Sequence, residues 1–384
     1  MKYIARVQEA RLLESLRPQK VTLLLGARRT GKTVLVKRIL ERVEEPFLFL
    51  QGENIATQEL LSRRTTAHFQ SLLGDKKLLV IDEAQGIPEI GKVLKLMVDT
   101  IEGVKVLVTG SSAFGLAELT GAPLTGRKTT LHLYPISEEE LLPEESPEEK
   151  RDNLRQRLVF GSYPDLFHLP NREDKIEFLQ ELLQSYLMKD ILAFENVRNA
   201  PQLFNLLRLV AYQVGSVVSY NELGRQLGIS KNTVIRYLDL FTKVYILFPV
   251  GGFSRNLRKE VVKNSKWYFY DNGIRNALIA NFNPIEMRND QGQLWENYVI
   301  SERVKFQHYH RMVVNNFFWR TYDQQEIDWV EEREGRLFGY EMKWGATRKT
   351  KVPRTWLQSY PEAEFQVITP DNFLSWVTPE RTSE

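Results

Sequence analysis

One stretch, KVTLLLGARRTGKTVLVKRIL at residues 20–40, restricts the fold of this chain more than any other. Its apolar run Val21–Leu25 predicts a buried strand, and the residues after the second glycine predict a helix. Glycines let backbone N–H groups curl around phosphate oxygens, and the helix N-terminus adds its positive dipole end. The stretch between strand and helix fits G-x-x-x-x-G-K-[ST], and the predicted nucleotide-binding residues are Gly26, Ala27, Arg28, Arg29, Thr30, Gly31, Lys32, Thr33 and Val34.

A second apolar strand, Leu78–Ile81, is followed by two acids, Asp82 and Glu83. An acid at such a strand end holds the magnesium shell, so Thr33 and Asp82 are the predicted Mg²⁺ ligands beside the phosphate loop. Lys32 is predicted to reach the β- and γ-phosphates. Glu83 is placed to polarise the attacking water, which predicts hydrolysis as well as binding.

A third strand, VKVLVTGSSAF at residues 104–114, ends in hydroxyl side chains. We predict that Ser111 contacts the γ-phosphate or positions the water; the alternative role is a helix cap, and one hydroxyl can do both. Arg127 precedes the next strand. It is predicted to stabilise transition-state charge as an arginine finger, either in its own chain or from a neighbouring subunit of a homo-oligomer. The alternative is an ordinary surface arginine.

The motifs at Gly26–Thr33, Asp82–Gln85 and Thr109–Ser112 resemble those of AAA-type P-loop ATPases. More narrowly, they are similar to a prokaryotic family with GxRRxGKT, DExQ and TGSS motifs. The resemblance covers about residues 1–135 and implies an ATP-binding α/β domain with a parallel five-stranded sheet. It also implies a helical lid or linker at about 136–200 and a C-terminal module of poorly known function.

The middle of the chain has the spacing of a helix-turn-helix. Gly224 is small where two helices would cross, Gly228 ends the first helix at a positive φ, and Ser230 caps the second. Two predicted strands around a basic turn follow, as in a wing. We therefore expect a winged helix over residues 201–275.

The expected winged helix is basic. Residues 219–275 contain 10 Lys and Arg against 4 Asp and Glu, whereas the whole chain has a net charge of only +3. Basic side chains would contact DNA phosphates and make the affinity depend on salt. The predicted DNA contacts are Lys231, Asn232, Arg236, Arg255 and Arg258. The alternative is a winged helix that serves as a lid or contacts a protein partner.

The last segment, residues 276–384, carries acids on successive elements. Glu296 lies in a predicted helix, Asp328 near the end of a first strand, and Glu341 and Lys343 alternate on a second strand joined to the first by a charged hairpin. Alternating residues of a strand point to one face. Over about residues 290–370 this layout resembles the PD-(D/E)xK nuclease fold.

That resemblance implies an Mg²⁺ site formed by Glu296, Asp328 and Glu341, in which the metal activates water at the scissile phosphate. Lys343 would orient the water or neutralise the transition state. Asp328, Glu341 and Lys343 are thus the predicted catalytic residues. Two alternatives stay open: a nuclease-like fold that only docks a partner, or a surface ion pair between Glu341 and Lys343.

Composition excludes several classes of protein. The chain has no cysteine, so it has no disulfide and no thiolate metal site. It has no run of roughly 18 apolar residues that would predict a transmembrane helix, and its N-terminus lacks the apolar core of a signal peptide. We expect a cytoplasmic protein.

Together these patterns predict an α/β chain: a P-loop ATPase with a helical lid, then a winged helix-turn-helix, then a nuclease-like domain. The predicted function is Mg²⁺-dependent ATP hydrolysis coupled to movement of the DNA-binding and nuclease-like modules. One alternative is a nucleotide-gated signalling ATPase whose C-terminal modules bind a protein partner. The other is a defence nuclease licensed by ATP.

Overall fold

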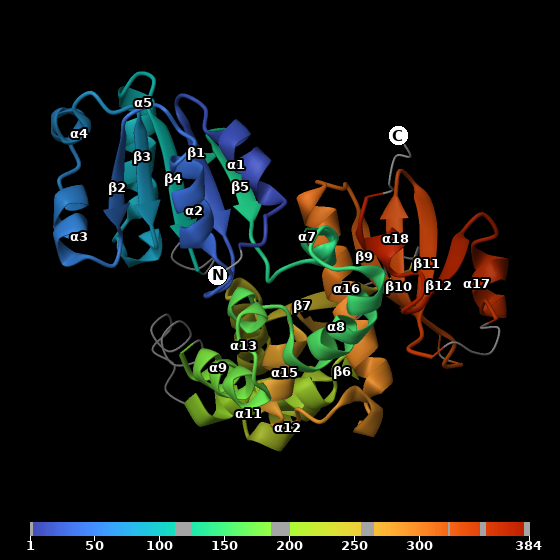
Figure 1. Ribbon diagram of the computed structural model, residues 1–384. Helices are drawn as coiled ribbons and strands as arrows, with labels where there is room; N and C mark the ends of the chain where they lie inside the picture. Colours follow the sequence, from blue (N-terminus) through green and yellow to red (C-terminus); the bar gives the residue numbers. More distant parts are fainter. Residues whose placement is uncertain are drawn as a thin grey trace. The chain divides into compact units, whose positions relative to one another are not determined.

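A computed structural model describes residues 3–111, 124–185, 200–254, 265–321, 323–345 and 351–379 (Figure 1). The chain divides into two compact units. Unit 1 comprises Met1–Pro135 with Lys243–Tyr245, and unit 2 comprises Ile136–Thr242 with Ile246–Glu384. Within the described ranges, every helix is too short or too polar to cross a membrane.

Unit 1 is built on a five-stranded parallel sheet in the order β2-β3-β4-β1-β5, which confirms the predicted parallel sheet. Its strands are β1 (Lys20–Leu25), β2 (Phe47–Gln51), β3 (Leu78–Asp82), β4 (Lys105–Gly110) and β5 (Lys128–His132). Its helices are α1 (Gln8–Ser15), α2 (Lys32–Leu40), α3 (Ile55–Ser62), α4 (Thr66–Leu73) and α5 (Ile90–Thr100).

The apolar strands of unit 1 explain this arrangement. All five residues of β3 and the last five of β1 are buried, as expected for parallel strands covered on both faces. Leu12 of α1 and Leu35 of α2 join Leu24, Val80 and Leu107 of the sheet in one core cluster. The sheet therefore holds the loop that follows β1 at its carboxyl edge, where ligands bind in open α/β sheets.

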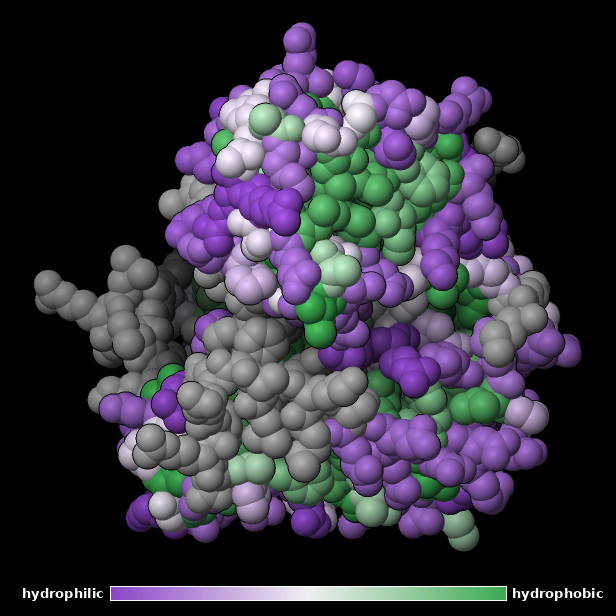
Figure 2. All heavy atoms as spheres, turned by 90° about the vertical axis from the view of Figure 1, so that its left-hand side faces the viewer, coloured by the Kyte–Doolittle hydropathy of each residue, from purple (hydrophilic) through white to green (hydrophobic). Residues whose placement is uncertain are grey.

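Strand β2 forms one edge of the unit 1 sheet. Its apolar residues are only partly buried, and Phe47 is 36% exposed. Figure 2 shows apolar side chains gathered on the side of the molecule that carries this edge. This strand thus leaves apolar surface in contact with solvent.

Unit 2 contains a mixed seven-stranded sheet in the order β12-β11-β10-β9-β7-β8-β6. Its strands are β6 (Val217–Val218), β7 (Leu247–Gly252), β8 (Ser265–Phe269), β9 (Asn315–Arg320), β10 (Glu326–Arg333), β11 (Arg336–Met342) and β12 (Glu364–Ile368). Its helices are α7 (Glu138–Leu141), α8 (Pro147–Phe160), α9 (Arg172–Ser185), α11 (Ala200–Tyr212), α12 (Tyr220–Leu227), α13 (Lys231–Lys243), α15 (Asn272–Leu278), α16 (Gln291–Tyr309), α17 (Arg354–Ser359) and α18 (Leu374–Val377).

The segments expected as a winged helix and as a nuclease-like domain share this sheet. Strand β7 pairs in parallel with β9, with Gly251 opposite Phe317 and Gly252 opposite Phe318. Shared backbone hydrogen bonds make the two segments one body. The boundaries that we predicted between lid, winged helix and nuclease-like domain therefore fall inside one compact unit.

Helices α12 and α13 have the turn that the sequence predicts. Gly228 has a φ of 66° at the C-cap of α12, and the Ser230 hydroxyl accepts a hydrogen bond from the N–H of Thr233 at 3.1 Å. A Cβ on Gly224 would meet the carbonyl oxygen of Ile229 at 2.7 Å, so the turn packs closely on the first helix. The backbone requirements of the turn account for these three residues.

The C-terminal strands differ from the expected pair. The stretch expected as the first strand forms two strands, β9 and β10, which pair in an antiparallel manner. Asp328 is consequently the third residue of β10 and lies near the start of that strand, not near its end. The turn between Arg320 and Glu326 reverses the chain, and Gln324 in it has a φ of 64°.

Candidate functional site

The phosphate loop connects β1 to the first turn of α2. A Cβ on Gly26 would meet the carbonyl oxygen of Leu133 at 2.0 Å, so a larger residue does not fit. Gly31 has a φ of 92°, in the left-handed region that glycine adopts without strain. Backbone geometry therefore requires both glycines of the motif.

Lys32 lies inside the curl of this loop. Its side chain is buried, and its Nζ donates hydrogen bonds to the carbonyl oxygens of Gly26 at 3.1 Å and Ala27 at 2.9 Å. The same nitrogen lies 3.8 Å from Oε1 of Glu83. The ammonium is thus placed at the centre of the loop, with an acid beside it.

Asp82 accepts hydrogen bonds from two hydroxyls. Thr33 Oγ1 donates to its Oδ2 at 2.8 Å, and Thr109 Oγ1 donates to its Oδ1 at 2.5 Å. Asp82 is only 4% exposed. A hydroxyl beside a buried carboxylate offers the hard oxygen atoms that Mg²⁺ takes together with phosphate oxygens and water, so these residues fit that ion.

Glu83 follows in a conformation that is uncommon for a residue with a side chain. Its φ is 53°, and such left-handed residues cluster at functional sites. Gln85 Nε2 donates to Oε2 of Glu83 at 2.6 Å and to Oγ of the buried Ser111 at 3.1 Å. Gln85 therefore connects the predicted base to the predicted γ-phosphate contact.

The remaining loop residues have different surroundings. Arg28 pairs with Glu53 at 3.6 Å, Arg29 is exposed with a φ of 61°, and Val34 is 52% exposed in the first turn of α2. Thr30 is fully buried, and its Oγ1 donates to the carbonyl oxygen of Ala27 at 2.9 Å. Of these four residues, Arg28 and Arg29 carry the positive charge that could contact a phosphate.

Sequence reasoning missed three residues of this site. Arg6 is buried, and its guanidinium donates to the carbonyl oxygens of Thr30 at 2.7 Å and Tyr134 at 2.6 Å, which ties the loop to the strand-end backbone. Thr109 donates to Asp82 and accepts from the N–H of Glu83 at 2.9 Å. Gln85 and Thr109 stood in recognised motifs, but no local signal marks Arg6.

Arg127 does not reach the phosphate loop of its own chain. It directly precedes β5, and its carbonyl accepts from the N–H of Val21 at the start of β1. The loop follows the other end of β1, and at about 3.3 Å per residue a six-residue strand separates the two by roughly 17 Å or more. Arg127 instead pairs with Asp99 of α5. The prediction that Arg127 acts as an arginine finger in its own chain is therefore wrong. The prediction that it acts as a finger for a neighbouring subunit stays a prediction.

A second cluster of charges lies in unit 2, around the buried Lys266 of β8. Its Nζ lies 2.5 Å from Glu326 Oε1, 3.4 Å from Glu296 Oε1 and 3.7 Å from Asp328 Oδ1. These three acids come from α16 and β10. The fold thus brings two of the predicted nuclease residues to one lysine that the sequence motif did not include.

Glu341 and Lys343 complete this cluster. Lys343 Nζ donates to Glu341 Oε1 at 2.6 Å, and the N–H of Met342 donates to Asp328 Oδ2 at 2.9 Å. Burial and the charge of Asp328 raise the pKa of Glu341. Asp328 and Glu341 are therefore close enough to repel each other, and Lys343 partly compensates them.

These acids do not fit a magnesium site. Burial lowers the pKa of Lys266, but Glu296, Asp328 and Glu326 outweigh it and raise that pKa, so the ammonium stays charged. In the parts of the chain that the structure describes, no group of three or more His, Cys, Asp or Glu could hold a metal ion. Lys266 supplies the positive charge that we expected from Mg²⁺.

Burial raises the pKa of Glu296 from 4.5 to about 7, against the opposing effect of Lys266. At a pH between these values the folded protein holds a proton on Glu296 that the unfolded chain has released. The stabilisation from this group is therefore complete below pH 4.5 and is lost as the pH rises through 7. A pKa difference of one between the folded and unfolded states corresponds to about 1.4 kcal/mol of unfolding free energy.

We accordingly expect the urea concentration at the unfolding midpoint of the wild type to be lower at pH 8 than at pH 5. The variant Glu296→Gln, which cannot ionise at this position, should show a smaller fall. The measurement is urea unfolding of both proteins at the two pH values. Equal falls in both proteins would contradict the role of Glu296.

The parallel sheet, the phosphate loop and the two strand-end acids of unit 1 define a P-loop nucleoside triphosphatase domain. Residues 18–142 match the family described as an AAA domain. This part of the chain is therefore similar to AAA-type P-loop domains, and the match supports nucleotide binding and hydrolysis at the level of the family. Residues 151–285 and 291–376 match two domains of unknown function, DUF8612 and DUF4143.

Relatives and solved structures extend over more of the chain. An uncharacterized protein of Mycobacterium tuberculosis is 26% identical over 339 residues, which cover 87% of this chain and 72% of that protein. One of Methanocaldococcus jannaschii is 24% identical over 307 residues, covering 74% and 66%.

Two solved structures are similar to more than half of this chain. The Walker-type ATPase of Pyrococcus abyssi is 18% identical, with a TM-score of 0.48 over 72% of this chain and 96% of that chain. The RuvB Holliday junction branch migration motor of Thermotoga maritima is 16% identical, with a TM-score of 0.34 over 64% and 89%.

Proposed function

We propose that this chain binds ATP with Mg²⁺ and hydrolyses it. The observation that carries the proposal is the meeting of Lys32, Thr33, Asp82 and Glu83 at one edge of the unit 1 sheet. An ammonium for the phosphates, a hydroxyl–carboxylate pair for the metal and a second acid for the water are the parts that phosphoryl transfer to water needs.

Each residue has one task in this proposal. The loop backbone and Lys32 hold the β- and γ-phosphates and neutralise charge that develops as the terminal phosphoryl group leaves. Thr33 and Asp82 would hold the metal, which would supply positive charge to stabilise the phosphate oxygens. Glu83 accepts a proton from the water that attacks the γ-phosphorus, the bond to the β-phosphate oxygen breaks, and ADP and phosphate result.

The test is nucleotide retention and ATP turnover of wild type and Lys32→Ala with Mg²⁺ present. We expect the variant to lose affinity at least about tenfold, because 1.4 kcal/mol corresponds to a factor of ten and a buried ammonium at the phosphates is worth at least that. Lys95→Ala, an exposed lysine of α5, is the control that should behave as wild type. A folded wild type that neither retains nor consumes ATP would end this proposal.

We also propose that hydrolysis moves unit 2 on DNA. Lys231, Asn232 and Arg236 are exposed on α13, and Asn232 and Arg236 are four residues apart on one helix face, which supports a groove-facing role. Arg255 and Arg258 lie outside the described residues. Because β7 and β9 share a sheet, the DNA-binding segment and the nuclease-like segment would move as one body. A finger from a neighbouring subunit, through Arg127, belongs to the same proposal.

Binding of labelled duplex DNA at two salt concentrations tests this second part. Each phosphate contact contributes about −0.9 to the slope of log affinity against log salt. Lys231→Ala should make the slope shallower by about that amount. A slope near zero in the wild type would instead favour a protein partner for unit 2. Cutting of nucleic acid is not proposed, because the acids that would hold the metal are paired with Lys266 and Lys343.

A further inference from the structure

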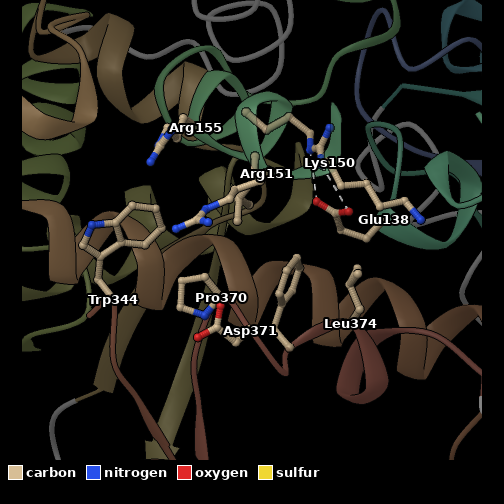
Figure 3. A pocket seen from close by; sticks show the side chains of 11 residues that line it. Glu138, Lys150, Arg151, Arg155, Trp344, Pro370, Asp371 and Leu374 are labelled. Atoms are coloured by element: carbon tan, nitrogen blue, oxygen red, sulfur yellow. Dashed lines mark hydrogen bonds and ion pairs between the residues drawn. The ribbon is translucent and has the colours of Figure 1, made fainter. Parts of the chain in front are cut away.

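Unit 2 contains a cavity of about 570 Å³ between α8 and the segments that follow β11 and β12 (Figure 3). Its size lies within the range of small-molecule sites. It shares no residue with the phosphate loop or with the charge cluster around Lys266. Its chemistry therefore belongs to neither site described above.

One wall of the cavity is cationic. Lys150, Arg151 and Arg155 line it from α8. Arg151 and Arg155 are four residues apart, so they lie on one face of the helix. Arg155 forms ion pairs with Asp152 and Glu286, each at 3.2 Å. For the side chains of Lys150 and Arg151, by contrast, the described part of the chain offers no hydrogen bond or ion pair.

The side chains that line the cavity carry more positive than negative charge. Arg157 is buried and pairs with Glu138 at 3.0 Å and with Glu145 at 2.7 Å, so its charge is already compensated. Apart from Glu138, Asp371 on the opposite wall is the only acid among the described residues that line the cavity. Arg155 is compensated by Asp152 and Glu286, so Lys150 and Arg151 against Asp371 leave a surplus of positive charge that favours an anionic ligand.

The opposite wall is apolar and includes one partly exposed indole. Trp344, Pro370, Phe373 and Leu374 line it. The ring of Trp344 packs against that of the fully buried Trp295, with centroids 5.7 Å apart, which fixes its orientation. An indole held in place beside guanidinium groups matches the way in which proteins bind bases and phosphates together.

We infer that this cavity binds a nucleoside phosphate group, with the base against Trp344 and Pro370 and the phosphate at Arg151 and Lys150. The group is either a free mononucleotide or part of a single strand of nucleic acid, since both present a flat base and an anionic phosphate. Trp344 directly follows Lys343, so a strand in the cavity would run close to the Glu341–Lys343 pair. This inference goes beyond the proposed ATP hydrolysis, which uses other residues in unit 1.

The test uses the full chain carrying Lys32→Ala, so that the phosphate loop contributes little nucleotide binding. Two probes are titrated: thymidine monophosphate by calorimetry, and a short fluorescein-labelled oligothymidylate by anisotropy. We expect Arg151→Ala and Trp344→Leu each to weaken binding about tenfold, and Trp344→Phe to retain most of it because the ring is kept. Arg354→Ala, an exposed arginine at the start of α17, is the matched control and should bind as the parent does.

The outcomes distinguish a free nucleotide from a nucleic-acid strand, and they distinguish this cavity from other binding sites. Binding of both probes assigns a nucleotide site, and binding of the oligonucleotide alone assigns a strand site. Binding that is unchanged in Arg151→Ala and Trp344→Leu but lost in Lys231→Ala would overturn the inference, and so would equal displacement of both probes by an acidic peptide. ATP turnover of Arg151→Ala in the otherwise wild-type chain should be unchanged, so a failure here is distinct from a failure of the proposed ATPase.

Discussion

Replacing Glu83 by glutamine should leave ATP binding intact and slow ATP turnover by about 10²–10⁴-fold, the contribution of a general base. Glutamine keeps the shape of the side chain and still accepts the hydrogen bond from Gln85. It cannot take a proton from water at neutral pH. Lys32, Thr33 and Asp82 are unchanged, so the phosphates and the metal are held as before.

Single-turnover hydrolysis and equilibrium binding of ATP, measured on the same preparation, check this expectation. Glu59→Gln, which makes the same chemical change at an exposed position of α3, should have wild-type turnover. If Glu83→Gln turns over at the wild-type rate, another group activates the water. If it loses binding as well, Glu83 holds the loop together through its contact with Lys32.

Lys266→Met is expected to destabilise the protein by about 3–5 kcal/mol, the usual cost of removing one partner from a buried ion pair. The variant would leave Glu296, Glu326 and Asp328 without the ammonium that now lies within 2.5 to 3.7 Å of them. Methionine is similar in length to lysine, so the loss would come from charge more than from packing. Urea unfolding at neutral pH measures the change.

Two further variants sharpen this measurement. Lys351→Met, at an exposed position of the same unit, should stay within about 0.5 kcal/mol of wild type. Adding Glu326→Gln to Lys266→Met should recover part of the loss, because it removes one of the uncompensated charges. If the Lys32→Ala variant, which keeps Lys266, gained stability on addition of Mg²⁺, that result would contradict the assignment of Lys266 as the cation of this cluster.

Expectation and structure agree better in unit 1 than in unit 2. In unit 1, the sheet and the loop around Lys32 are as the sequence predicts. In unit 2, the cap residues Gly228 and Ser230 are also as predicted. The position of Arg127 in its own chain is not, because a residue that precedes a parallel strand lies at the edge of the sheet opposite the phosphate loop. In unit 2 the elements carrying Glu296, Asp328 and Glu341 were expected, but their central partner was not.

Sequence alone determined the strand–loop–helix of residues 20–40 and the two acids at the end of β3, because tight turns, caps and strand ends depend on the residues that form them. Only the tertiary structure decided that Lys266 lies among carboxylates 30 to 62 residues away, that β7 pairs with β9, and that Trp344 faces the arginines of α8. Such contacts depend on strand order and register across the chain. A single sequence contains no local pattern that specifies either one.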